Sequence, residues 1–187
     1  MRKKINKKNN WVLKTMILSF VISVIFTTIS ELAIPNVNLF FGIILIITFV
    51  FIGILFDMIG VAVTTSDESV FHSMAAKKVR GAKLAIKFKK NADRVANLCQ
   101  DVVGDICGII SGSTGAVISL KIIEKLNVPN LLIILTIMGT ISTLTIGGKA
   151  MVKSVAIKKA NDIVYRFAYL ISFCIKGWFV WIKKGLR

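Results

Sequence analysis

The sequence has few of the residues that soluble enzymes use for catalysis or for crosslinking. It contains one histidine, two prolines and three cysteines. Cys99, Cys107 and Cys174 make an odd count, lie in apolar surroundings and have no metal-type spacing, so we expect free buried thiols. The chain has no HExxH, P-loop, GxGxxG or nucleophile-elbow motif. These absences argue against an enzyme and against an organic cofactor.

Acidic residues are also scarce, with 9 Asp and Glu against 25 Lys and Arg and a net charge of +16. A charge of this size is typical of disordered or nucleic-acid-binding chains. Here, however, 55% of the residues are hydrophobic and the mean hydropathy is +0.76. No aromatic platform or recognition motif accompanies the charge, so we do not expect a nucleic-acid partner. The apolar and the cationic residues must be segregated along the chain.

The apolar residues form long runs that reach or approach the length of a membrane span. About 20 apolar residues cross a hydrocarbon core of about 30 Å as a helix. We predict four such spans, over residues 12–34, 39–64, 95–120 and 131–148. The predicted fold is therefore an all-α polytopic membrane helix bundle.

The cations between the runs predict the orientation of this bundle in the cell membrane. An even number of spans puts both termini on one side, and basic segments near span ends resist translocation. Only Lys121 and Lys125 then lie in outer loops. We expect a basic cytoplasmic tail over residues 1–11, a transmembrane bundle over 12–148, a basic cytoplasmic segment over 149–187, and both termini in the cytoplasm.

Two further helices are predicted on the cytoplasmic side. Residues 73–91 carry many lysines and indicate a basic juxtamembrane helix. Residues 163–181 are amphipathic, with Arg166 and Lys176 on one face and Trp178 and Trp181 on the other. We interpret this segment as an in-plane helix on anionic inner-leaflet lipids, the alternative being a fifth span.

Carboxylates inside the spans are the strongest functional signal. An ionised Asp at the bilayer centre costs about 2.5–3.5 kcal/mol, so it needs a partner, a proton or water. At about 1.5 Å per residue, Asp57 and Asp101 lie at similar depth from the inner ends of their spans, and Asp105 follows one turn later. With Ser111 they offer hard oxygen ligands of the kind that magnesium prefers. Protonated, hydrogen-bonded acids that only stabilise the bundle are the alternative.

Small residues follow the same helix face in the third span. Gly104, Gly108 and Gly112 give two overlapping GxxxG steps, which allow close helix approach in lipid. We therefore expect the third span at the centre of the bundle.

The segment from Phe56 to Cys107 resembles the transmembrane domain of the CorB/CorC and CNNM magnesium transporters. The resemblance is carried by FDMIGVAVTTSDES at 56–69, the basic KKVRGAKLAIKFKKNADRV at 77–95, and ANLCQDVVGDICG at 96–108. It is greatest to short bacterial CorB-like proteins that consist of the membrane part without the regulatory domains. The resemblance implies a dehydrated magnesium ion held near Gly104, Asp105 and Asp57, a homodimer, and regulation by a separate partner.

The sequence thus predicts a CorB-like role in transport or binding of a divalent cation, magnesium or cobalt. The predicted oxygen ligands are Asp57, Asp101, Asp105, Gly104 and Ser111. The alternative is a non-transporting membrane scaffold or regulator that binds anionic lipid or a partner membrane protein.

Overall fold

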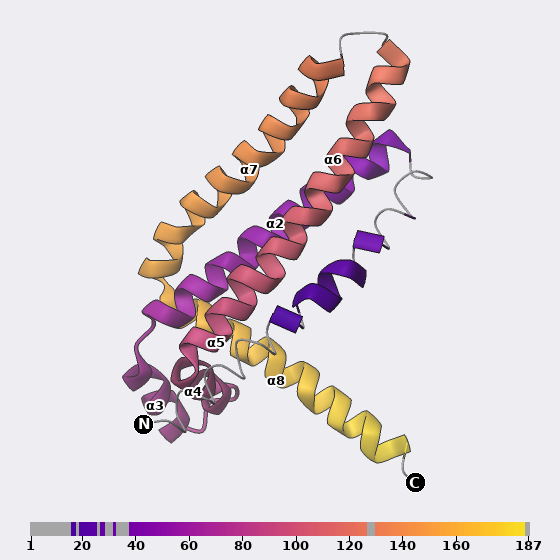
Figure 1. Ribbon diagram of the computed structural model, residues 1–187. Helices are drawn as coiled ribbons and strands as arrows, with labels where there is room; N and C mark the ends of the chain where they lie inside the picture. The colour runs from indigo at the N-terminus through magenta and orange to yellow at the C-terminus, as the bar shows by residue number, and fades with distance from the viewer. Residues whose placement is uncertain are drawn as a thin grey trace, which may run out of the picture. The chain divides into compact units, whose positions relative to one another are not determined.

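The computed structural model describes residues 16–17, 19–25, 27–28, 32, 38–126 and 130–185, with the side chains of 125–126, 130 and 174–185 left out. All the elements described are helices, as the all-α prediction requires (Figure 1). They are α2 (Leu39–Thr65), α3 (Glu68–Ala76), α4 (Ala82–Lys90), α5 (Ala92–Asn97), the π-helix η2 (Leu98–Val103), α6 (Gly104–Leu126), α7 (Asn130–Lys158) and α8 (Ala160–Gly185).

Three of the helical runs described are long and apolar enough to cross a membrane. They are Leu39–Thr65, Ala92–Glu124 and Leu131–Lys158, and they contain the predicted spans 39–64, 95–120 and 131–148 completely. The first predicted span, 12–34, falls largely outside the described residues; those of its residues that are described are helical. The count of four spans therefore stays a prediction.

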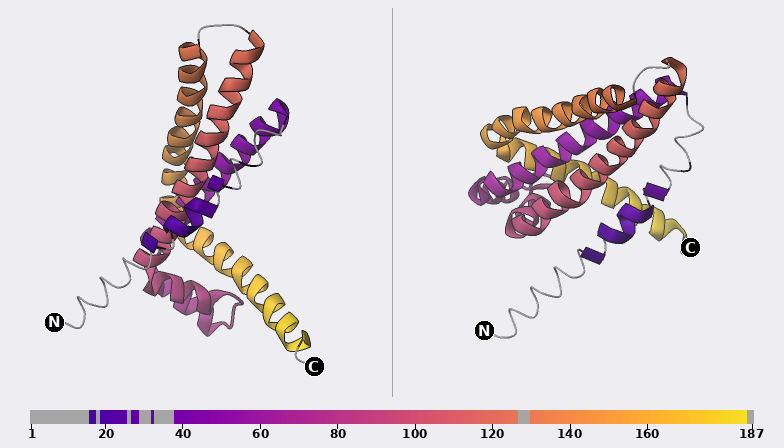
Figure 2. Two further views of the ribbon diagram at one scale, coloured as in Figure 1. Left: turned by 45° about the vertical axis from the view of Figure 1, so that its right-hand side comes forward. Right: turned by 45° about the horizontal axis from the view of Figure 1, so that its top comes forward.

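The chain folds as two compact units. The first comprises Met1–Gly53 with Gly104–Ile146, and the second Ile54–Val103 with Gly147–Arg187. Helix α6 and the first part of α7 lie side by side in the first unit (Figure 2). Glycines allow the approach: a Cβ atom at Gly115 would overlap Ile141 of α7, and one at Gly42 of α2 would lie 2.8 Å from Ile118 Cδ1 of α6.

Most of the apolar surface in the first unit faces outward. None of the residues in the most apolar stretch of α7 is buried. Leu131 and Ile146, for example, are 68% and 70% exposed. Water would not tolerate so much exposed apolar surface on a monomer, whereas lipid would.

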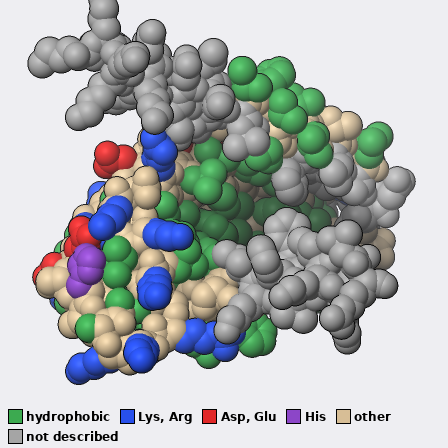
Figure 3. All heavy atoms as spheres, turned by 90° about the horizontal axis from the view of Figure 1, so that it is seen from below, with side chains coloured by type: hydrophobic (Ala, Val, Ile, Leu, Met, Phe, Trp, Pro, Cys, Tyr) green, Lys and Arg blue, Asp and Glu red, His purple; other side chains and the backbone are tan. Residues whose placement is uncertain are grey.

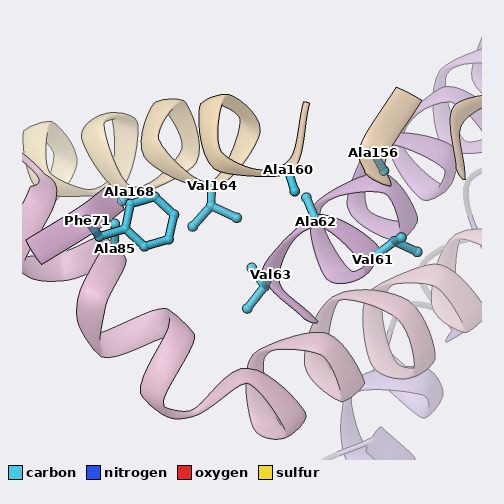
Figure 4. Packing of buried hydrophobic residues seen from close by; sticks show 9 residues of the cluster. All are labelled: Val61, Ala62, Val63, Phe71, Ala85, Ala156, Ala160, Val164 and Ala168. Carbon is cyan, nitrogen blue, oxygen red and sulfur yellow. The ribbon is translucent and has the colours of Figure 1, made fainter. Parts of the chain in front are cut away.

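The second unit has a conventional apolar core. Phe71 of α3 is fully buried, and its ring lies beside Ala85 of α4 and Ala168 of α8 (Figure 4). Val164 of α8 and Val63 of α2 are also fully buried in this cluster. Small alanines at the contacts let the helix backbones come close while the one large ring fills the space between them.

The prediction of a single basic helix over residues 73–91 was wrong. The structure has two helices there, α3 and α4, joined by a turn in which Lys78 and Gly81 adopt positive φ values of 57° and 88°. Tertiary packing explains the break, because a Cβ at Gly81 would lie only 3.0 Å from Tyr169 Cα of α8. The turn folds α4 back so that both helices contact α8.

The predicted carboxyl-terminal segment is helical. Helix α8 covers the whole predicted segment 163–181. It is not among the candidate spans found in the described residues. Its placement in the plane of the inner leaflet remains a prediction.

The thiol prediction holds where the structure describes it. Cys99 and Cys107 are buried, and neither forms a disulfide within the described residues. The side chain of Cys174 lies outside the described residues.

Candidate cation site

A π-helical segment interrupts the third helical run at the position of the predicted ligands. Residues Leu98–Val103 form η2, and α6 begins directly after it at Gly104. A π-helical turn bonds N–H groups to carbonyls five residues back, so it widens the helix and leaves a carbonyl without its ordinary partner. Such turns occur frequently at functional sites. Asp101 lies within this segment and is exposed.

Asp57 lies on the face of α2 that approaches this run. It is partly buried, and it shares one helix face with Gly53 and Gly60, four residues before and three residues after it. Within the second unit, a Cβ at Gly60 would overlap the side chain of Gln100 and lie 3.3 Å from the carbonyl oxygen of Ala96. Glycine is therefore needed where α2 meets α5 and η2. This contact within the second unit brings together the elements that carry Asp57 and Asp101.

The other predicted ligands belong to the first unit. Gly104 is buried and Asp105 is exposed, in the first turn of α6. Ser111 is 2% exposed, and its hydroxyl donates to the carbonyl oxygen of Gly108 at 3.0 Å. That hydroxyl oxygen keeps lone pairs that could face a cation.

The predicted ligands do not form a carboxylate cluster. Among the residues that the structure describes, no three His, Cys, Asp or Glu side chains lie close enough together to hold a metal ion. A cation site here would depend on backbone carbonyls and hydroxyls as well as on acids. Such donors carry no sequence signature, so sequence reasoning emphasised the aspartates.

The glycine stripe of the third run divides into two kinds of position. Gly115 is required for the contact with α7, but a Cβ at Gly108 or Gly112 would meet no atom of the described chain within 4 Å. Gly108 and Gly112 therefore do not mediate packing among the described helices. A contact between two copies of the chain at this stripe remains a prediction.

The sequence did not indicate that a lysine of another helix binds the C-terminal end of α2. Lys89 of α4 is partly buried, and its ammonium group donates to the carbonyl oxygens of Thr64 at 2.8 Å and Val63 at 3.4 Å. A cation at a helix C-terminus interacts favourably with the helix dipole and satisfies carbonyls that have no helical partner. The basic segment thus holds the end of the helix that carries Asp57.

Acidic residues beyond the end of α2 have local structural roles. Asp67 caps α3, because its carboxylate accepts from the N–H of Ser69 at 3.0 Å and from the Ser69 hydroxyl at 2.8 Å. These hydrogen bonds hold the pKa of the Asp67 carboxyl below its usual value. Glu68 pairs with His72 at 3.1 Å and with Lys90 at 3.8 Å.

Comparison with protein families decides the assignment. Residues 43–183 match the family described as the Cyclin M transmembrane N-terminal domain, CNNM. The chain belongs to the CNNM family. The match covers most of α2, all of the elements from α3 to α7 and most of α8, so the CNNM assignment rests on most of the described helices rather than on one motif. No curated protein and no solved structure matches the chain.

CNNM membership confirms the resemblance drawn from the residues of 56–107. It supports, at a coarse level, a membrane protein related to divalent-cation transport rather than an enzyme. The ion, the ligands and the oligomeric state remain predictions.

Proposed function

We propose that this CNNM domain moves or binds a divalent cation, with magnesium as the candidate ion, in the membrane. The observation that carries the proposal is the π-helical segment Leu98–Val103, which lies against the glycine face of α2 in a chain that matches the CNNM family. This arrangement combines a partly buried acid with a distorted backbone, and hard divalent cations bind carboxylate and carbonyl oxygens.

In this proposal the ligands are those predicted from the sequence: Asp57, Asp101 and Asp105 supply carboxylates, Gly104 a carbonyl and Ser111 a hydroxyl. Magnesium keeps several of its waters in many protein sites, so the protein need not supply every ligand. Both termini lie in the cytoplasm, and the chain forms a homodimer.

Flux measurements on the full chain in liposomes test the proposal. Magnesium entry, reported by an internal dye, should fall at least about tenfold in Asp57→Asn and in Asp105→Asn, because the change removes a charge without changing shape. Asp162→Asn is the matched control, since Asp162 is an exposed acid in the first turn of α8. Equal flux in all three variants would contradict the proposed ligands.

A second candidate function is a non-transporting scaffold or regulator. The exposed lysines and arginines of the turn after α3, of α4 and of α5 favour it, and Figure 3 shows basic side chains gathered on the face seen from below. This candidate predicts no magnesium flux with the wild-type chain in the same liposomes. It also predicts that the aspartate variants keep every other property of the wild type.

A further inference from the structure

The turn between α3 and α4 forms a pocket together with α8, entirely within the second unit. Its volume is about 660 Å³. The lining includes three basic side chains, Lys78, Arg80 and Lys83, and four apolar ones, Ala75, Ala76, Val79 and Leu84. No acidic side chain lines it among the described residues. The pocket therefore combines concentrated positive charge with an apolar floor.

The backbone of this turn is strained, and its packing against α8 maintains the strain. Lys78 has a φ of 57°, a left-handed conformation that costs a non-glycine residue roughly 1–2 kcal/mol. Gly81 at φ 88° lies so close to Tyr169 that only glycine fits. Strain of this kind persists where the surrounding structure over-determines it, and it is common at ligand sites. Here it brings Lys78 and Arg80 to one pocket.

Aromatic side chains of α8 orient the arginine. The Arg80 guanidinium carbon lies 5.9 Å from the ring centre of Tyr169 and 5.6 Å from that of Phe173. Cation–π contacts hold the planar group in place while its N–H donors stay available. A planar guanidinium of this kind is suited to bidentate recognition of a phosphate.

The electrostatics of α4 also favour an anion at the pocket. The helix has no acid in its first turn and no side-chain cap at Gly81, whereas Lys83 lies in that turn. Positive charges at a helix N-terminus oppose the helix dipole, and an anion there would relieve the conflict. The cations of the pocket thus lie at an end of α4 where a bound negative charge stabilises them.

The apolar surroundings indicate the kind of anion. Phe173 of α8, which contacts Arg80, and Leu170 of the same helix are 64% and 63% exposed. A soluble phosphate would leave these side chains in water, whereas the acyl chains of a lipid would cover them. We propose that this pocket binds the phosphate headgroup of an anionic phospholipid, with its acyl chains against α8. The site is separate from the proposed cation site and does not depend on it.

Thermal unfolding of the full chain in nanodiscs tests this site. Replacing phosphatidylcholine in part by phosphatidylglycerol should raise the Tm of the wild type by about 2–4 °C. Lys83→Gln should lose most of that rise, because Lys83 is exposed and its loss removes one charge without disturbing the core. Arg80→Lys should lose part of it, because a lysine keeps the charge without the planar fork. Lys153→Gln, an exposed lysine of α7 outside the pocket, is the matched control and should keep it.

Three results would overturn the assignment. Equal Tm values in the two lipids would show that headgroup charge is not recognised. Equal losses in Lys83→Gln and Lys153→Gln would show general charge attraction rather than a pocket. A rise of the same size with inorganic phosphate in phosphatidylcholine nanodiscs would assign the pocket to a soluble phosphate instead.

Discussion

The two units of the chain are stabilised in different ways. In the first unit α6 meets its neighbours at Gly42 and Gly115, and none of the residues in the most apolar stretch of α7 is buried. In the second unit Phe71, Val63 and Val164 are fully buried in a compact cluster. Burial of leucine side chains does not stabilise the association of helices in lipid, so these helices associate through close packing of small residues. Burial of large apolar side chains stabilises a segment that contacts water, which is the environment expected for the basic segment that carries α4.

The largest expected effect comes from removing the centre of the second unit. Phe71→Ala should lower the free energy of unfolding by about 3–5 kcal/mol, because a fully buried phenylalanine leaves a cavity. Phe51→Ala is the control of the same residue type, since Phe51 of α2 is 59% exposed. Reversible denaturant unfolding in micelles measures both. Similar losses in the two variants would mean that the units are not stabilised differently.

The next effect tests glycine packing in the first unit. A Cβ at Gly53 would lie 3.2 Å from Cys107 Cβ of α6, and a Cβ atom is attached directly to its helix backbone, so side-chain rotation cannot relieve the contact. Gly53→Val should therefore destabilise the chain by about 1–3 kcal/mol.

Gly139→Ala of α7 is the matched glycine control, because its Cβ would meet nothing within 4 Å in the described chain. It should be neutral or slightly stabilising, since alanine has the higher helix propensity. The same unfolding assay compares the two. A loss at Gly139 as large as at Gly53 would point to a contact with another copy of the chain.

The hydropathy of the sequence accounts for most of what could be predicted. Long apolar runs cannot be placed anywhere but in lipid, so the helices at 39–65, 92–124 and 131–158 were predictable within a few residues, except for the extension of the last beyond Gly148. The break after α3 was not predictable. The segment KKVRGAK contains no proline, and the turn depends on the contact of Gly81 with α8, which is 88 residues away in sequence at Tyr169.

The candidate cation site was predictable only in its acids. Asp57 and Asp101 stand out because carboxylates are rare in apolar runs. The π-helical segment that contains Asp101 has no comparable signal in the sequence, and only the structure shows it beside Gly60. In the sequence Lys89 is one of many lysines, and only the fold shows that its ammonium group binds the end of α2.

The connection made by Lys89 gives a third prediction. Lys89→Met keeps the aliphatic stem but removes the donor to the Thr64 and Val63 carbonyls, at a cost of about 1.5–3 kcal/mol. Lys87→Met, at an exposed position of the same helix, should change the free energy of unfolding far less. Hydrogen exchange of the amides in the last turn of α2 should accelerate in the first variant alone. Unchanged exchange would mean that Lys89 does not hold this helix end.

A fourth prediction concerns the strained turn. Lys78→Gly should stabilise the chain by up to about 1 kcal/mol, because glycine adopts a φ of 57° without a steric penalty. Gly81→Ala should do the opposite, since the added Cβ would face both a φ of 88° and the backbone of α8 at 3.0 Å. Unfolding midpoints of the two variants should therefore move in opposite directions. If both rise, the turn is not over-determined by its contact with α8.

The smallest expected effect is the pH dependence of the cap at the start of α3. Because hydrogen bonds from Ser69 lower the pKa of Asp67 from 3.8 in the folded state, the carboxylate stabilises the fold above that pH. The contribution is lost as the pH falls through the lower folded value. Ser69→Ala keeps the backbone N–H donor and removes only the hydroxyl at 2.8 Å, so part of the shift should remain. Its unfolding midpoint should lie slightly below the wild type at pH 7, and the gap should narrow at pH 3. A gap of constant size would mean that the hydroxyl acts through packing and not through the charge of Asp67.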